Sequence, residues 1–164
     1  MKTKIIVFDW AGTTVDFGSL APVAAVIKAF EDFGLSPTLA ETRAPMGLAK
    51  RTHLAQMLAG ERLAKAWTEK FGRPPGEADV DQVYARFEPA LMAVLGDHTD
   101  LLPGVAETVA WLKFRGFLIA STTGYSRAMM ELVAPSARAA GYAPDALVCP
   151  DEAGGLGRPY PYML

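Results

Sequence analysis

The chain has 164 residues, of which 51% are hydrophobic and 21% are charged, a composition typical of one globular domain or a small core with an insertion. Its formal net charge of -2 gives no electrostatic basis for binding nucleic acid. The N-terminal apolar run, residues 5–8, is too short for a signal peptide, and no stretch approaches the length of a membrane span. The single cysteine, Cys149, excludes a disulfide within the chain. We therefore expect a soluble cytoplasmic protein that binds neither nucleic acid nor membranes.

The first predicted element is a buried β-strand over residues 4–9, short and β-branched as in parallel sheets. Apolar residues at helical spacing then predict a series of helices. These helices cover residues 19–34, a stretch after Gly47, residues 61–71 and residues 80–94. Ser19 is the candidate N-cap of the first helix, and Pro89 should bend or break the last one.

After a boundary at Pro103, the chain alternates helices with strands. A helix from Val105 to Gly116, a strand over 117–121, a helix over 126–140 that Pro135 disturbs and a strand over 146–149 are predicted in that order. This alternation predicts an α/β fold with a parallel sheet. The helices between residues 20 and 98 are too many for one crossover, so we interpret them as an inserted helical subdomain.

Asp9 stands at the end of the first strand, where catalytic groups gather in open parallel sheets. Gly12, Thr13 and Thr14 follow it and supply a tight turn, backbone donors and hydroxyl groups. A carboxylate in that position is able to attack phosphorus and form an acyl phosphate. From the strand and the turn alone, a turn-opening or helix-capping aspartate is the favoured interpretation.

The string Phe8-Asp9-Trp10-Ala11-Gly12-Thr13-Thr14-Val15-Asp16 resembles the first motif of the haloacid dehalogenase superfamily. Most phosphatases of that superfamily carry a second aspartate, the general acid, where this chain has Ala11, which has no proton to donate. The Asp-Trp-Ala-Gly-Thr form is similar to the phosphonoacetaldehyde hydrolase (phosphonatase) branch. The resemblance implies that Asp9 is the nucleophile, that Gly12 and Thr13 contact phosphate, and that Mg²⁺ binds to the Asp9 carboxylate and the Ala11 carbonyl.

Residues 46–53 resemble the segment that carries the Schiff-base lysine of that branch, and Lys50 occupies the matching position with Met46 as a substrate contact. His53 lies three residues later, so both side chains share one face of a helix. Cleaving a carbon–phosphorus bond needs an electron sink, which a protonated imine provides. In isolation, a helical lysine is most often a solvated surface residue and a lone histidine most often a packing residue. The resemblance implies catalytic roles for both.

The two later strand ends carry further polar residues. The segment Ser121-Thr122-Thr123-Gly124-Tyr125 resembles the second motif of the superfamily, which implies that Thr123, Gly124 and Tyr125 contact the phosphonate. An ordinary helix N-cap is the alternative, and both roles are compatible. Residues 157–163 resemble the third motif, which implies that Arg158 pairs with the phosphoryl group rather than being a surface arginine.

The resemblance implies a Rossmann-like three-layer core over residues 1–18 and 99–164, with an all-helical cap over residues 19–98. It also implies hydrolysis of phosphonoacetaldehyde to acetaldehyde and phosphate, and a homodimer formed through the cap helices. Family members continue to a fourth motif, Gly-Asp-Thr, that helps to hold magnesium. Because the chain ends at Leu164, we expect an incomplete core, an exposed edge on the first strand and little activity from residues 1–164 alone. The alternatives are another phosphatase or phosphomutase of the superfamily, and an inactive relic or phosphate-binding module.

Overall fold

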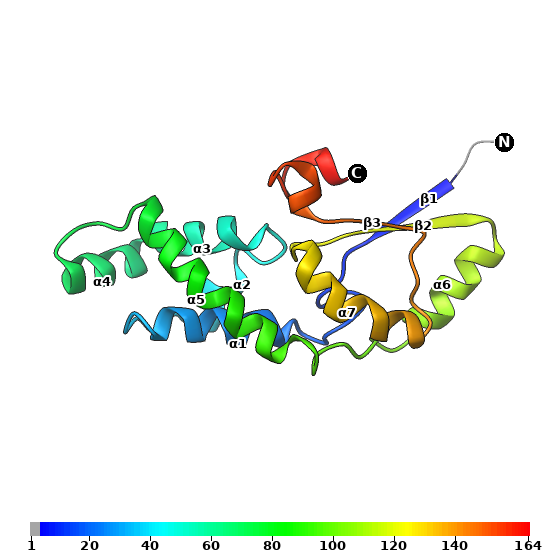
Figure 1. Cartoon of the computed structure of the whole chain (residues 1–164), viewed down its shortest axis with the longest axis horizontal. Coiled ribbons are helices and arrows are strands. Elements are labelled where there is room, and N and C mark those ends of the chain that lie inside the picture. Colours follow the sequence, from blue (N-terminus) through cyan, green and yellow to red (C-terminus); the bar gives the residue numbers. More distant parts are fainter. Residues whose placement is uncertain (1–3) are drawn as a thin grey trace. The chain divides into compact units, whose positions relative to one another are not determined.

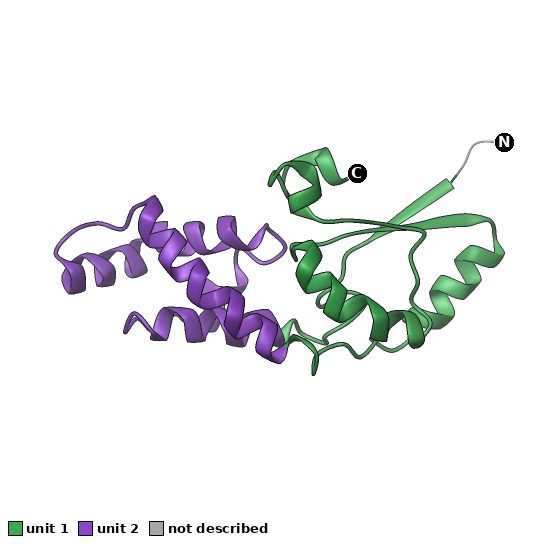
Figure 2. Cartoon of the chain, viewed as in Figure 1, with its two compact units in different colours: residues 1–20, 95–164 green, residues 21–94 purple. Residues whose placement is uncertain are grey.

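The computed structural model describes residues 4–164, which form two compact units (Figure 2). Unit 1 contains the described residues up to Leu20 together with residues 95–164, and unit 2 contains residues 21–94. Unit 2 is thus an insertion into the sequence of unit 1. None of the helices formed by residues 4–164 has the length and apolar character needed to cross a membrane.

Unit 1 is built on a three-stranded parallel sheet, which confirms the predicted α/β class. The strands are β1 (Lys4–Phe8), β2 (Phe117–Thr122) and β3 (Ala146–Val148). The order is β1-β2-β3, with Phe8 opposite Ser121 and Thr122 opposite Val148 at the carboxyl ends. All three strands therefore end at the same edge of the sheet, and β1 lies at one side of it, with Ile5 and Val7 exposed.

The helices of unit 1 are α6 (Val105–Phe114) and α7 (Arg127–Ala139), followed by two short 3-10 helices, η1 (Pro150–Ala153) and η2 (Pro161–Met163) (Figure 1). Each α-helix is adjacent in the chain to β2, which is the middle strand. The apolar face of α7 is buried through Met129, Met130, Val133 and Ala137. Pro135 lies inside this helix without ending it, so the predicted disturbance does not interrupt α7.

Unit 2 is entirely helical, as predicted for the inserted segment. Its helices are α1 (Leu20–Glu31), α2 (Leu39–Arg43), α3 (Lys50–Ala59), α4 (Glu61–Phe71) and α5 (Glu77–Leu95), the first and last of which start or end one residue inside unit 1. Its core comes from large apolar side chains on all of the longer helices. They include Val26, Phe30, Leu54, Leu58, Leu63, Trp67, Val83, Phe87 and Leu91.

Two local predictions need correction. The helix α5 continues through Pro89 instead of breaking, because the fully buried Phe87 and Leu91 hold both sides of the proline in the core. The start of α1 is capped by Asp16, whose Oδ1 accepts a hydrogen bond from the Leu20 N–H at 3.0 Å. Ser19 instead adopts a left-handed conformation with φ 53°, which differs from the extended conformation of an N-cap residue.

The short helix α2 was not predicted, although its start has a recognisable sequence signal. Thr38 and Glu41 form a capping box, in which the Glu41 carboxylate accepts a hydrogen bond from the Thr38 N–H at 2.7 Å. The Glu41 N–H in turn donates to the Thr38 hydroxyl at 3.2 Å. With only five residues, the helix is too short to show a hydrophobic period.

Candidate active site

The loop after β1 wraps tightly around the backbone of Trp10. The carbonyl of Trp10 accepts hydrogen bonds from the N–H groups of Thr13, at 2.9 Å, and Thr14, at 2.8 Å. The Thr14 hydroxyl donates to the Asp9 carbonyl at 3.0 Å. Gly12 has φ 78°, and a Cβ atom there would lie 2.4 Å from the Ser19 hydroxyl oxygen, so the turn requires glycine. The loop therefore holds Asp9 in a fixed position at the end of the strand.

Asp9 and Arg158, which are 149 residues apart in sequence, meet in unit 1. The Arg158 Nη2 donates to Asp9 Oδ1 at 2.9 Å, and each side chain is 30% exposed. The same oxygen accepts a hydrogen bond from the Trp10 N–H at 2.8 Å. The Nε of Arg158 is buried without a hydrogen-bond partner among the described residues. The predicted nucleophile and the predicted phosphoryl-binding arginine thus share one site.

Thr123 and Tyr125 lie in the loop that follows β2, and both are buried. The Thr123 hydroxyl accepts a hydrogen bond from the Tyr125 N–H at 3.1 Å, so this hydroxyl shapes the loop. Burial raises the pKa of the Tyr125 phenol, and the negative charges of Asp16 and Asp9 raise it further. The phenol of Tyr125 is therefore neutral near pH 7, and it lies close enough to Asp9 for the carboxylate charge to raise its pKa. Gly124 lies between the two and is partly exposed.

Tyr142 completes this site, and the sequence analysis did not identify it. Its hydroxyl lies 3.0 Å from the Ser121 hydroxyl, which donates to the Phe8 carbonyl at 2.9 Å. Its ring meets the Trp10 ring edge to face at 5.0 Å between centroids. Burial raises the pKa of Tyr142, against the hydrogen bonds of Ser121 and Thr14, which lower it. Tyr142 follows α7 with no motif around it, so no local pattern distinguished it from a packing residue.

Lys50 is the first residue of α3 in unit 2, and it is buried, with 7% of the residue exposed. Its Nζ lies 3.9 Å from the Met46 sulfur, which brings the predicted lysine and the predicted methionine together. A lysine this deeply buried is uncommon, because a charged ammonium group loses its hydration there. The neutral form of this amine is the nucleophilic one.

His53 lies one turn further along α3 and is fully buried. Neither ring nitrogen forms a well-aligned hydrogen bond within the described residues. Burial lowers the pKa of His53 to about 4, the positive charge of Lys50 contributes in the same direction, and the Thr42 backbone partly opposes them. His53 is consequently neutral near pH 7 and able to accept a proton.

Arg51, the neighbour of Lys50 in sequence, points away from the lysine toward another helix. Its guanidinium reaches α5, where it pairs with Glu77 and Asp81, each at 2.8 Å. The side chain is 45% exposed, and two carboxylates balance its charge. Arg51 therefore ties α3 to α5.

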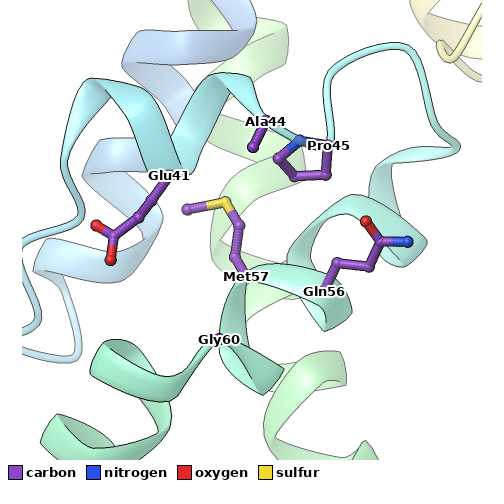
Figure 3. A pocket seen from close by; sticks show the side chains of 6 residues that line it. All are labelled: Glu41, Ala44, Pro45, Gln56, Met57 and Gly60. Carbon is purple, nitrogen blue, oxygen red and sulfur yellow. The ribbon is translucent and has the colours of Figure 1, made fainter.

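A pocket of about 250 Å³ lies in unit 2 beside the segment that leads to Met46 (Figure 3). Its lining consists of Glu41, Ala44, Pro45, Gln56, Met57 and Gly60. Figure 3 shows the Met57 thioether between the side chains of Glu41 and Gln56, with Ala44 and Pro45 above it in this view. Glu41 at its rim is bound by Arg62, with 2.7 Å between Arg62 Nε and Glu41 Oε1. Lys50 and His53 do not line this pocket, so it is separate from the lysine site.

The predicted metal ligands offer two oxygen donors. Asp9 supplies a carboxylate. Ala11 and Val15 form a β-bridge whose two hydrogen bonds run from the Gly12 N–H to the Val15 carbonyl and from the Val15 N–H to the Trp10 carbonyl. The Ala11 carbonyl takes part in neither of these two bonds. Residues 4–164 contain no cluster of three or more metal-binding side chains. The carboxylates of Asp151 and Glu152 both bind Arg127.

The sequence motifs and this geometry agree with a comparison against protein families. The model of the haloacid dehalogenase-like hydrolases matches residues 3–164, nearly the whole chain. The chain belongs to the haloacid dehalogenase-like hydrolases. The resemblance to the phosphonoacetaldehyde hydrolase branch is also confirmed by individual relatives.

Among curated members of this hydrolase family, a phosphonoacetaldehyde hydrolase from Paraburkholderia phytofirmans is 47% identical over 98% of this chain and 60% of its own length. One from Bacillus cereus is 45% identical over 99% of this chain and 61% of its own length. The crystal structure of a phosphonoacetaldehyde hydrolase-like protein from Oleispira antarctica matches with a TM-score of 0.93 and 37% identity, over 98% of this chain and 58% of that chain. The chain therefore spans about 60% of the length of these relatives.

Proposed function

We propose that the protein hydrolyses the carbon–phosphorus bond of phosphonoacetaldehyde and releases acetaldehyde and phosphate. The observation that carries this proposal is the burial of Lys50 beside Met46 and His53. A haloacid dehalogenase-like phosphatase that cleaves phosphate esters has no need of a buried amine. It does need a general acid, and Ala11 is unable to act as one. The names of the relatives point to the same substrate.

The first half of the proposed reaction takes place at Lys50. Its neutral amine adds to the aldehyde carbon, and His53, neutral near pH 7 because its pKa is about 4, accepts the proton that the nitrogen loses in this addition. His53 returns this proton to the oxygen of the addition product, and a second proton from solvent lets that oxygen leave as water, which gives a protonated imine. The imine then accepts the electron pair of the carbon–phosphorus bond, which an unmodified aldehyde accepts far less readily.

The second half takes place at Asp9. One carboxylate oxygen bonds to phosphorus as the carbon–phosphorus bond breaks, and the released electron pair moves into the imine to form an enamine. Protonation of the enamine at carbon and hydrolysis of the resulting imine release acetaldehyde and restore Lys50. Water attacks the acyl phosphate on Asp9 and releases phosphate.

Unit 1 supplies the groups that bind the phosphoryl oxygens in this proposal. Arg158 already lies 2.9 Å from the Asp9 carboxylate, so a guanidinium is available where negative charge gathers. The backbone around Gly12 and Thr13 and the loop of Thr123 and Gly124 flank the same strand ends. Tyr125 offers a neutral phenol.

Magnesium is included in the proposal. The Asp9 carboxylate and the Ala11 carbonyl would provide two of its oxygen ligands, and a bound ion would reduce the repulsion between Asp9 and the dianionic phosphonate. We also propose that unit 2 acts as the cap over the core, that the protein is a homodimer through the helices of unit 2, and that it works in the cytoplasm. These three points rest on the resemblance to phosphonoacetaldehyde hydrolases.

Trapping the imine tests this function. Borohydride added with phosphonoacetaldehyde should reduce the imine and leave a two-carbon adduct on Lys50, located by mass spectrometry of the peptide. The variant Lys50→Arg should show neither adduct nor phosphate release, because a guanidinium stays protonated and is a poor nucleophile. The matched control is Lys65→Arg, because Lys65 lies in the same unit with its side chain 76% exposed. An adduct distributed equally over Lys28, Lys65 and Lys70 would contradict the proposal.

A further inference from the structure

Arg127 connects two segments of unit 1 that are distant in sequence. It is the first residue of α7, directly after the loop that contains Thr123 and Gly124. Its Nη2 donates to the Leu147 carbonyl in β3 at 3.0 Å and also binds the Glu152 carboxylate. The guanidinium therefore joins the end of the second strand to the end of the third.

The backbone of Arg127 makes a second connection to the same segment. Its N–H donates to both carboxylate oxygens of Asp151, at 3.2 and 3.0 Å. An acidic side chain at the first turn of a helix satisfies an N–H group that has no partner within the helix, and it also interacts favourably with the helix dipole. Ser126 accepts a hydrogen bond from the Met129 N–H at 3.4 Å and caps the same end of α7.

Glu152 extends this network into the backbone of the turn after β3. The carboxylate oxygen that binds Arg127 also accepts a hydrogen bond from the Cys149 N–H at 2.8 Å. The chain then runs from Glu152 through η1 to Arg158, which pairs with Asp9 at 2.9 Å. Arg127 therefore lies four residues after Thr123, and it contacts Glu152, which lies six residues before Arg158.

We propose that Arg127 is a positioning residue that holds the Thr123–Gly124 loop and the Arg158 segment in register for a dianionic phosphoryl group. The inference rests on the proposed function in one respect, namely that these two segments bind the phosphoryl oxygens. Two sets of donors bind one tetrahedral anion well only when their separation is fixed, and small displacements of such groups weaken binding strongly. Arg127 does not itself touch the anion in this proposal.

Calorimetric titration with inorganic phosphate tests the inference separately from turnover. Arg127→Gln should weaken phosphate binding about tenfold and raise the KM for phosphonoacetaldehyde more than it lowers kcat. Arg127→Lys, which keeps the charge and one donor, should recover part of the loss. Borohydride trapping at Lys50, in unit 2, should persist in both variants at saturating aldehyde. The control is Arg138→Gln, an exposed arginine in the last turn of the same helix, which should bind phosphate as the unmodified protein does.

Phosphate affinity in Arg127→Gln within about twofold of the unmodified protein would overturn the inference, as would a loss that Arg127→Lys does not relieve at all. If Arg127→Gln does not fold, Glu152→Gln tests the inference instead. This variant retains the hydrogen bond from Arg127 to the Leu147 carbonyl, so it should show a smaller loss of phosphate affinity. Unchanged phosphate affinity in a folded Glu152→Gln protein would then overturn it. A protein that binds phosphate in an Arg127-dependent manner but forms no adduct at Lys50 would retain this inference and lose the proposed function.

Discussion

The sites in the two units differ in the surroundings that they give to an ionisable side chain. In unit 1, the Asp9 carboxylate is part-exposed and is held by an arginine and a backbone N–H group. In unit 2, Lys50 is buried next to a sulfur atom and a histidine that lacks well-formed hydrogen bonds. Polar donors surround the carboxylate in unit 1, whereas the imidazole in unit 2 is neutral near pH 7 because burial lowers its pKa. The proposed reaction requires an anionic nucleophile at phosphorus and a neutral amine at carbon, and it assigns these two groups to the two units.

The largest effect should come from removing the charge in unit 1. In a version of the protein extended through the fourth motif, Asp9→Asn should reduce phosphate release by about a thousandfold or more, because an amide is a poor nucleophile. Trapping of the aldehyde on Lys50 should continue, since it depends on the environment in unit 2. Phosphate release and adduct formation are measured on the same preparation. Near-normal phosphate release, or loss of the adduct together with turnover, would contradict the proposal that unit 1 acts at phosphorus and unit 2 acts at the aldehyde carbon.

The next effect concerns pH and the uncharged environment in unit 2. His53 has a pKa of about 4 in the folded protein, against 6.5 for an unperturbed histidine. Above pH 6.5 the imidazole is neutral in both states, so the full stability is present. As the pH falls from 6.5 toward 4, the unfolded chain takes up a proton that the folded protein excludes, and about 3 kcal/mol of stability is lost.

Denaturant unfolding at several pH values between 7 and 4.5 measures this loss. His53→Gln should flatten the pH dependence of the free energy of unfolding, whatever it does to the stability at pH 7. The matched control is His98→Gln, which removes the histidine of unit 1 and should leave the steep part of the dependence in place. A pH dependence that His53→Gln leaves unchanged would mean that the imidazole is hydrated or hydrogen-bonded in solution.

The smallest effect should come from the capping box of α2, which precedes the segment with Met46. Thr38→Ala removes the side-chain hydrogen bonds to Glu41 and should lower the stability by about 1 kcal/mol. Thr38→Ser, which retains the hydroxyl, should lose much less. Phosphate binding by unit 1 should not change in either variant, and a parallel loss of phosphate affinity would show that the sites are not energetically independent.

The sequence was most informative where local chemistry decides the structure. The predictions for strand β1 and for helix α4 at residues 61–71 agree with the structure. Asp9 and Arg158, which were identified from separate motifs, form a hydrogen bond that was not predicted. Of the bend or break predicted at Pro89, the break does not occur, because the burial of Phe87 and Leu91 outweighs the local preference of proline.

The parts that the sequence did not predict depend on contacts between distant residues. The role of Tyr142 becomes visible only when β2 brings Ser121 beside it, and the partners of Arg51 lie 26 and 30 residues away on α5. Asp16 was passed over as the cap of α1, because its carboxylate reaches the Leu20 N–H only after residues 16 and 19 both adopt left-handed conformations. The identities of these two residues, aspartate and serine, do not predict a left-handed conformation from a single sequence.

Gly12 affects the whole segment between β1 and α1, because a side chain at this position would meet Ser19 at the end of that segment. A methyl group there would be placed 2.4 Å from the Ser19 hydroxyl oxygen, while φ stands at 78°. Ser19 immediately precedes α1, the helix through which the chain enters unit 2. An alanine at position 12 would therefore disturb both the loop that carries the nucleophile and the first residues of the insertion. The strain of a positive φ, together with the required shift of the Ser19 side chain, should make substitutions at this position destabilising, although glycine contributes no functional group to the chemistry.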